Sequence, residues 1–125
     1  MAYWIYMLTM TMIIPVIMII IGIVFAKHYP AKINHISGYR TRMSMKNMDT
    51  WKYAHQVSSR LWFRCGIVLL PATMICMLFF IGRSIDVISY GGLLITMIQL
   101  AVMILTIPVI EHALHQRFRE DGTLR

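Results

Sequence analysis

Charged residues are missing from three long stretches of this 125-residue chain. No Asp, Glu, Lys or Arg occurs in residues 1–26, 65–82 or 87–110. Only 14% of all residues are charged, against about a quarter in ordinary soluble domains. A helix rises ~1.5 Å per residue, so about 20 apolar residues cross a hydrocarbon core of ~30 Å. A chain this short could hardly bury three such runs, and we expect a membrane protein rather than a soluble bundle.

The sequence also lacks the patterns that mark common enzymes and metal sites. It has no P-loop, dinucleotide fingerprint, HExxH motif or nucleophile–base pair. His112 and His115 would share a helix face beside Glu111, but no third ligand follows at a convincing spacing. On a helix, Cys65 and Cys76 would lie ~16 Å apart, too far for a disulfide. We therefore expect no enzyme, no catalytic residue, no metal and no cofactor.

The charge-free stretches predict an all-α membrane protein with three transmembrane helices. The first stretch is interpreted as a retained span, because it lacks a basic n-region and is longer than a signal-peptide core of ~7–15 residues. The chain is expected to form a single integral membrane domain, residues 1–125, with spans at about 4–26, 61–82 and 87–110, a cytoplasmic loop at 27–60 and a cytoplasmic tail at 111–125.

The distribution of Lys and Arg predicts the orientation of these spans. Only Arg83 lies in the short connection between the second and third spans. Because cytoplasmic connections are enriched in Lys and Arg, the first loop and the C-terminus should be cytoplasmic and the N-terminus outside. The net charge of +7 then faces anionic lipid, and no direct nucleic-acid partner is expected. The cations on the cytoplasmic side are Lys27, Lys32, Arg40, Arg42, Lys46, Lys52, Arg60, Arg64, Arg117, Arg119 and Arg125.

The second half of the first loop has the pattern of an amphipathic helix. Trp51, Ala54 and Ser58 begin a stripe at helical spacing, and Lys52 lies on the other side. Asn47 or Asp49 can cap its first turn. Such a helix should lie in the membrane interface, anchored by Trp51, and then bend or continue into the second span.

The first half of this loop combines a turn with groups that bind anions. Gly38 permits a positive φ, and the planar fork of Arg40 suits phosphate or carboxylate. Thr41 and Ser44 can bond to the loop backbone. These residues fit an anchoring loop that binds lipid headgroups, and they also fit a dedicated recognition surface.

Two other polar residues should find partners on neighbouring elements. Gln99 is a strong hydrogen-bonding group deep in the third span, and in lipid it should bond to another helix. Glu111 follows that span at the inner boundary, where it could form an ion pair with a loop arginine such as Arg40.

Two separated groups of residues resemble motifs of the SdpI family of bacterial membrane proteins. The first matches the pattern N-x-x-x-G-Y-R-T-x-x-S-x-x-N/D-x-x-x-W-x-x-A-N/H, which in that family lies between two transmembrane helices. The second resembles the closing motif of a Glu, a Leu, a Phe and a final Asp/Asn-Gly. The matching residues are Asn34, Gly38, Tyr39, Arg40, Thr41, Ser44, Asn47, Trp51, Ala54 and His55, and then Glu111, Leu114, Phe118, Asp121 and Gly122.

The resemblance implies a function in toxin immunity at the bacterial cytoplasmic membrane. Characterised members of the family protect the producing cell against a secreted peptide toxin, and some also signal by drawing a small cytoplasmic repressor to the membrane. The implied partners are the lipid bilayer, a peptide toxin and such a repressor, with a homo-oligomer left open. The implied binding residues are Asn34, Gly38, Tyr39, Arg40, Thr41, Ser44, Trp51, His55 and Glu111.

Three other functions remain open on the same scaffold. A small membrane transporter or channel would be favoured by ionisable residues inside the spans, and these spans have almost none. A lipid-handling membrane enzyme and a structural subunit of a membrane complex are the remaining alternatives.

Overall fold

Three long helices make up most of the protein. The computed structural model describes residues 1–29, 31–33 and 38–124. Its helices are α1 (Ala2–Lys27), α2 (Met48–Leu78) and α3 (Ile85–Arg117), and each is long and apolar enough to cross a membrane. The described residues contain no β-strand, only an isolated bridge between Phe118 and Leu124. The prediction of an all-α chain with three helices long and apolar enough to span a membrane is confirmed.

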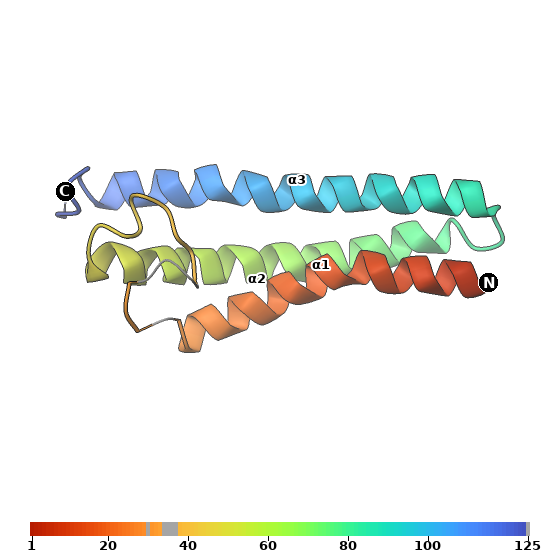
Figure 1. The fold of residues 1–125 in the computed structure, drawn as a ribbon, viewed down its shortest axis with the longest axis horizontal. Helices are drawn as coiled ribbons and strands as arrows, with labels where there is room; N and C mark the ends of the chain where they lie inside the picture. Colours follow the sequence, from red (N-terminus) through yellow and green to blue (C-terminus); the bar gives the residue numbers. More distant parts are fainter. Residues whose placement is uncertain (30, 34–37, 125) are drawn as a thin grey trace.

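The helices run side by side and leave two unlike ends (Figure 1). The N-terminus of α1 and the turn between α2 and α3 lie at one end, which we call the turn end. The segment before α2 and the C-terminal tail meet at the other, which we call the loop end. Toward its own C-terminus α1 diverges from α3, so the two are farther apart at the loop end.

Helix α2 is one continuous element, so the predicted helix before the second span continues into that span, and its expected place in the membrane interface is not supported. Asn47 begins it as the N-cap: its side chain accepts from the Thr50 N–H, and Thr50 returns the bond in a capping box. No Gly or Pro follows until Gly66, so nothing interrupts the backbone hydrogen bonds. Trp51 and Ala54 are fully buried in the protein. The apolar stripe therefore packs against other parts of the chain and not onto lipid.

Glycine lets α1 and α2 approach to backbone contact. A Cβ added at Gly22 would lie 2.8 Å from the Phe63 nitrogen and 2.8 Å from the Ser59 oxygen, both backbone atoms of α2. A Cβ at Gly66 would lie 2.9 Å from the carbonyl oxygen of Pro15. Small residues at such crossings are common between membrane helices, where close packing drives association.

A polar contact joins all three helices within the bundle. Pro15 has no N–H, so the carbonyl of Thr11 one turn earlier lacks its usual helical partner. Gln99 of α3 supplies one: its Nε2 donates to the Thr11 oxygen at 2.9 Å and to Thr73 Oγ1 of α2 at 2.8 Å. This confirms that Gln99 bonds to neighbouring helices.

The loop end has a hydrophobic core of its own, while the outer faces of the helices stay apolar. Exposed side chains such as Val68, Ile104 and Leu105 cover the middle of the bundle, as expected for surfaces that meet lipid. The core beneath the loop holds the segment before α2 and the tail against α2 and α3. It consists of Met43, Ala54, Ile110, Leu114 and Phe118, with Tyr39, Tyr53, Val57 and Leu61 packed against it.

Candidate functional site

Two hydrogen bonds join the loop before α2 to α3 and the tail. The Tyr39 hydroxyl donates to Glu111 Oε1 at 2.9 Å. The Asn47 Nδ2 donates to the carbonyl oxygen of Gly122 at 2.8 Å. Gly122 has a φ of 91°, and a Cβ there would lie 2.6 Å from Asn47 Nδ2. Both bonds span more than half of the sequence, so the two motif segments form one structure at the loop end.

The imidazole of His55 fixes the path of the loop. The backbone N–H of Tyr39 donates to His55 Nε2 at 3.0 Å, so this nitrogen carries no proton. His55 Nδ1 is then the protonated nitrogen, and it donates to the carbonyl oxygen of Trp51 at 2.7 Å. The side chain is fully buried, with ring centroids of Trp51, Phe25 and Tyr29 at 4.5, 4.8 and 5.5 Å. His55 thus holds the loop as a neutral acceptor.

A compact turn follows Tyr39. The Thr41 N–H donates to Ser44 Oγ at 2.8 Å, and the Ser44 N–H donates to Thr41 Oγ1 at 3.2 Å. Thr50 of α2 donates to the Ser44 carbonyl oxygen at 3.1 Å. Gly38 begins the turn with a φ of 91°, as its position predicts. The loop's own hydroxyl groups therefore close the turn, and the Thr50 hydroxyl ties it to the first turn of α2.

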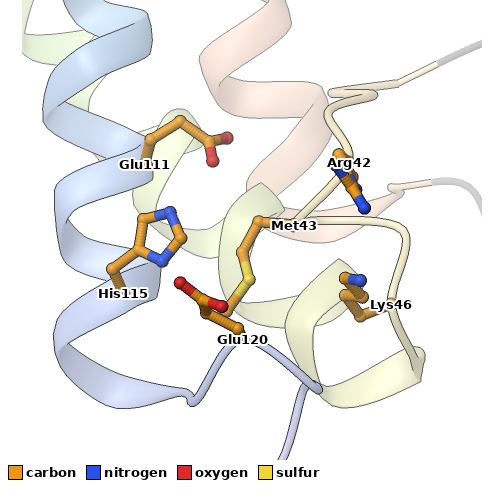
Figure 2. Close-up of a pocket in the computed structure, with 6 residues that line it drawn as sticks. All are labelled: Arg42, Met43, Lys46, Glu111, His115 and Glu120. Atoms are coloured by element: carbon orange, nitrogen blue, oxygen red, sulfur yellow. The ribbon is translucent and has the colours of Figure 1, made fainter.

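A pocket of about 290 Å³ lies between the loop and α3. Figure 2 shows Arg42 and Lys46 on the loop side, and Glu111 and His115 projecting from α3 on the other. The remaining lining residues are Met43 and Glu120. The pocket thus carries cationic groups on one wall and carboxylates on the opposite wall and the tail.

The phenol of Tyr39 is locked as a donor beside this pocket. Burial raises the pKa of Tyr39 above its ordinary value, and the hydrogen bond to Glu111 raises it further. The phenol stays protonated at physiological pH and keeps one oxygen of Glu111 occupied. The sequence predicts an ion pair from Glu111 to a loop arginine such as Arg40; the structure instead gives Glu111 the Tyr39 hydroxyl, with Arg42 lining the same pocket.

The tetrapeptide Gly38 to Thr41 lines a second pocket. The volume of this pocket is about 370 Å³, and Arg40 is an exposed residue of its lining. Phe25 of α1 and Trp62 of α2 add aromatic surface. The remaining lining residues are Ile21, Ser58 and Ile107. This pocket therefore opens between the polar loop and apolar parts of all three helices.

The predicted binding residues divide into pocket-lining and buried groups. Ser44, Trp51 and His55 are buried and support the loop, so the expected place of Trp51 at the lipid interface is not supported. Asn34 lies outside the described residues. The pocket-lining group is Gly38, Tyr39, Arg40 and Thr41 in the second pocket and Glu111 in the first.

The binding residues predicted from the sequence did not include Arg42, Lys46 or Glu120. All three line the pocket of Figure 2. Each is an ordinary surface charge in the sequence, and they face one pocket only because the tail folds back beside the loop. Asn47 belongs to the motif, but its bond to Gly122 could not be foreseen without that fold. Among the described residues, no group of three or more His, Cys, Asp or Glu side chains could hold a metal ion.

Comparisons with known proteins place these observations in a family context. The family model described as "SdpI/YfhL protein family" matches residues 31–110. A protein of Bacillus subtilis (strain 168) described as "Uncharacterized protein YfhL" is 40% identical over 53 residues, which are 42% of this chain. The match spans about half of that relative, 48% of its length. No solved structure matches the chain.

Proposed function

The chain belongs to the SdpI/YfhL protein family, and from this premise we propose that it is an immunity protein that protects the cell against a secreted antimicrobial peptide toxin. It acts by binding and not by catalysis. Family membership supports the general class, a membrane protein of an immunity family.

One observation carries the proposal: the two motif segments form a single polar platform. We define the polar platform as residues 38–47, Glu111 and residues 118–122. The Tyr39–Glu111 and Asn47–Gly122 hydrogen bonds hold its parts together. His55 fixes its first residues by accepting a hydrogen bond from the Tyr39 N–H. A platform fixed in this way is suited to recognition, because little conformational entropy remains to be lost when a partner binds.

The second pocket supports contact with a peptide in the membrane. Arg40 offers a guanidinium for a carboxylate, while Phe25, Trp62 and Ile107 offer apolar surface. An amphipathic toxin segment carries both kinds of group. The toxin is proposed to present its polar end to Arg40 and its apolar side to the helices.

The charge distribution supports a cytoplasmic position for the polar platform. Arg42, Lys46, Arg117 and Arg119 lie at the loop end, and Arg83 lies at the turn end. By the positive-inside rule the loop end faces the cytoplasm and the N-terminus of α1 faces outside. A platform on that side would also be accessible to a cytoplasmic repressor, which is the proposed route of any signalling.

Loss of the Arg40 guanidinium should strongly reduce protection. The gene is expressed in a sensitive bacterium, which is then challenged with peptide toxins encoded near its locus. Wild type is expected to restore survival. Arg40→Ala is expected to protect at least about tenfold less well than wild type, because hydrogen bonds to charged groups are among the stronger ones.

Lys52→Ala is the matched control, an exposed cation at the same end of the bundle and outside the second pocket. It should protect as well as wild type when membrane levels are equal. Survival that is the same with and without the gene, across the whole toxin panel, would refute the proposed function.

A further inference from the structure

We propose that the pocket between the loop and α3 binds the headgroup of phosphatidylethanolamine, in which a phosphate is joined to a primary ammonium. This lipid site is distinct from the second pocket assigned to the toxin, and it does not depend on the proposed immunity function.

The two walls of the pocket match the two charges of this headgroup. Arg42 and Lys46 approach from the loop, where a guanidinium fork and an ammonium group suit a phosphate. Glu111 and Glu120 supply carboxylates that accept hydrogen bonds from a primary ammonium, which has three N–H donors. Tyr39 donates to Oε1 of Glu111, and a carboxylate retains further acceptor positions.

Other common headgroups match only part of this arrangement. Phosphatidylglycerol has a phosphate and hydroxyl donors but no cation, so the carboxylates would gain no charge-assisted hydrogen bond. Phosphatidylcholine has a quaternary ammonium without N–H donors, so Glu111 and Glu120 could not hydrogen-bond to it. The pocket should therefore prefer the ethanolamine lipid.

The position of the pocket along α3 places it at headgroup level. Ile104, Ile107, Glu111 and His115 follow one another at spacings of three and four residues, so they form one face of the helix. Ile104 and Ile107 are 64% and 44% exposed, and Glu111 begins the polar part of the same face. An acyl chain can lie along Ile104, which does not line the second pocket, while its headgroup enters the pocket beside Glu111.

The size of the pocket limits the occupant. Its volume of about 290 Å³ lies just below the ~300–1,000 Å³ usual for small-molecule sites. A headgroup fits this space, and the lipid chains stay outside on the helix.

Lipid retention by the purified full-length protein tests this proposal. Native mass spectrometry in mild detergent compares phosphatidylethanolamine, phosphatidylglycerol and phosphatidylcholine with identical acyl chains. We expect wild type to prefer the ethanolamine lipid by about tenfold, the effect of one charge-assisted hydrogen bond. Glu120→Gln should lose this preference while its retention of phosphatidylglycerol is unchanged. Arg42→Gln should weaken retention of both lipids.

Arg83→Gln is the matched control, because it removes a cation at the turn end, and it should behave as wild type. Free phosphoethanolamine is tested as a competitor. Displacement only at concentrations well above that of the lipid assigns the site to the membrane lipid, whereas tighter binding of the free compound overturns that assignment. Equal retention of the three lipids, or equal selectivity in wild type and Glu120→Gln, would also overturn it. No toxin is present, so this outcome is independent of the protection assay.

Discussion

Trp51→Ala is expected to lower the free energy of unfolding by about 3–5 kcal/mol, the range for truncating a buried large aromatic residue. Trp51 is fully buried, and its ring centroid lies 4.5 Å from that of His55. Removing the indole leaves a cavity beside the imidazole that receives the Tyr39 N–H. The loss should therefore loosen the polar platform as well as destabilise α2. Unfolding by SDS in mixed micelles measures the change.

Two further variants separate packing from the mere loss of an aromatic residue. Trp51→Phe keeps an aromatic ring in the site and should lose less than half as much stability as Trp51→Ala. Tyr90→Ala removes an aromatic side chain that is 73% exposed, and it should change stability by no more than about 0.5 kcal/mol. If Trp51→Ala is as stable as Tyr90→Ala, Trp51 does not hold the loop end together.

Gly22→Leu is expected to cost about 3 kcal/mol or more, the second large effect on stability. A Cβ at this position would lie 2.8 Å from backbone atoms of Phe63 and Ser59, which cannot move aside as a flexible side chain can. Overpacking costs about 1–3 kcal/mol in well-packed cores, and a leucine adds more atoms than a single Cβ. Helices α1 and α2 must therefore separate at the loop end. The same SDS titration measures the loss.

The sign of the effect distinguishes close packing from helix propensity. In an exposed helix, replacing Gly by Ala stabilises by about 1 kcal/mol, whereas Gly22→Ala should destabilise. Ala72→Leu adds similar volume at an exposed position of α2 and serves as the control. A Gly22→Leu protein with wild-type stability would show that α1 does not pack on α2 through this glycine.

The helices and the local turns could be predicted from the sequence because they depend on neighbouring residues. The charge-free stretches predicted three helices long enough to span a membrane. The positive φ of Gly38 follows from its lack of a Cβ, and the N-cap at Asn47 follows from a side chain that bonds to the neighbouring backbone. The need of Gln99 for a partner follows from the cost of an unpaired amide in lipid.

What the sequence could not show depends on which segments meet. Tyr39 and Glu111 are 72 residues apart, and their bond requires the loop to lie over α3. The stripe that begins at Trp51 has the same spacing whether it faces lipid or protein. Periodicity alone therefore could not show that Trp51 is buried in the protein and does not face the lipid interface. The partner of Gln99 also depended on Pro15, whose missing N–H frees the carbonyl of Thr11.

Site-specific labelling tests most directly whether the start of α2 and the end of α3 both lie on the cytoplasmic side. Cys65 and Cys76 are first replaced by alanine, and single cysteines are placed at Lys52, Gln116 and Ile85, all exposed positions. A membrane-impermeant maleimide should label Ile85→Cys in intact cells. It should label Lys52→Cys and Gln116→Cys only after the membrane is permeabilised. Labelling of Lys52→Cys or Gln116→Cys in intact cells would contradict the account.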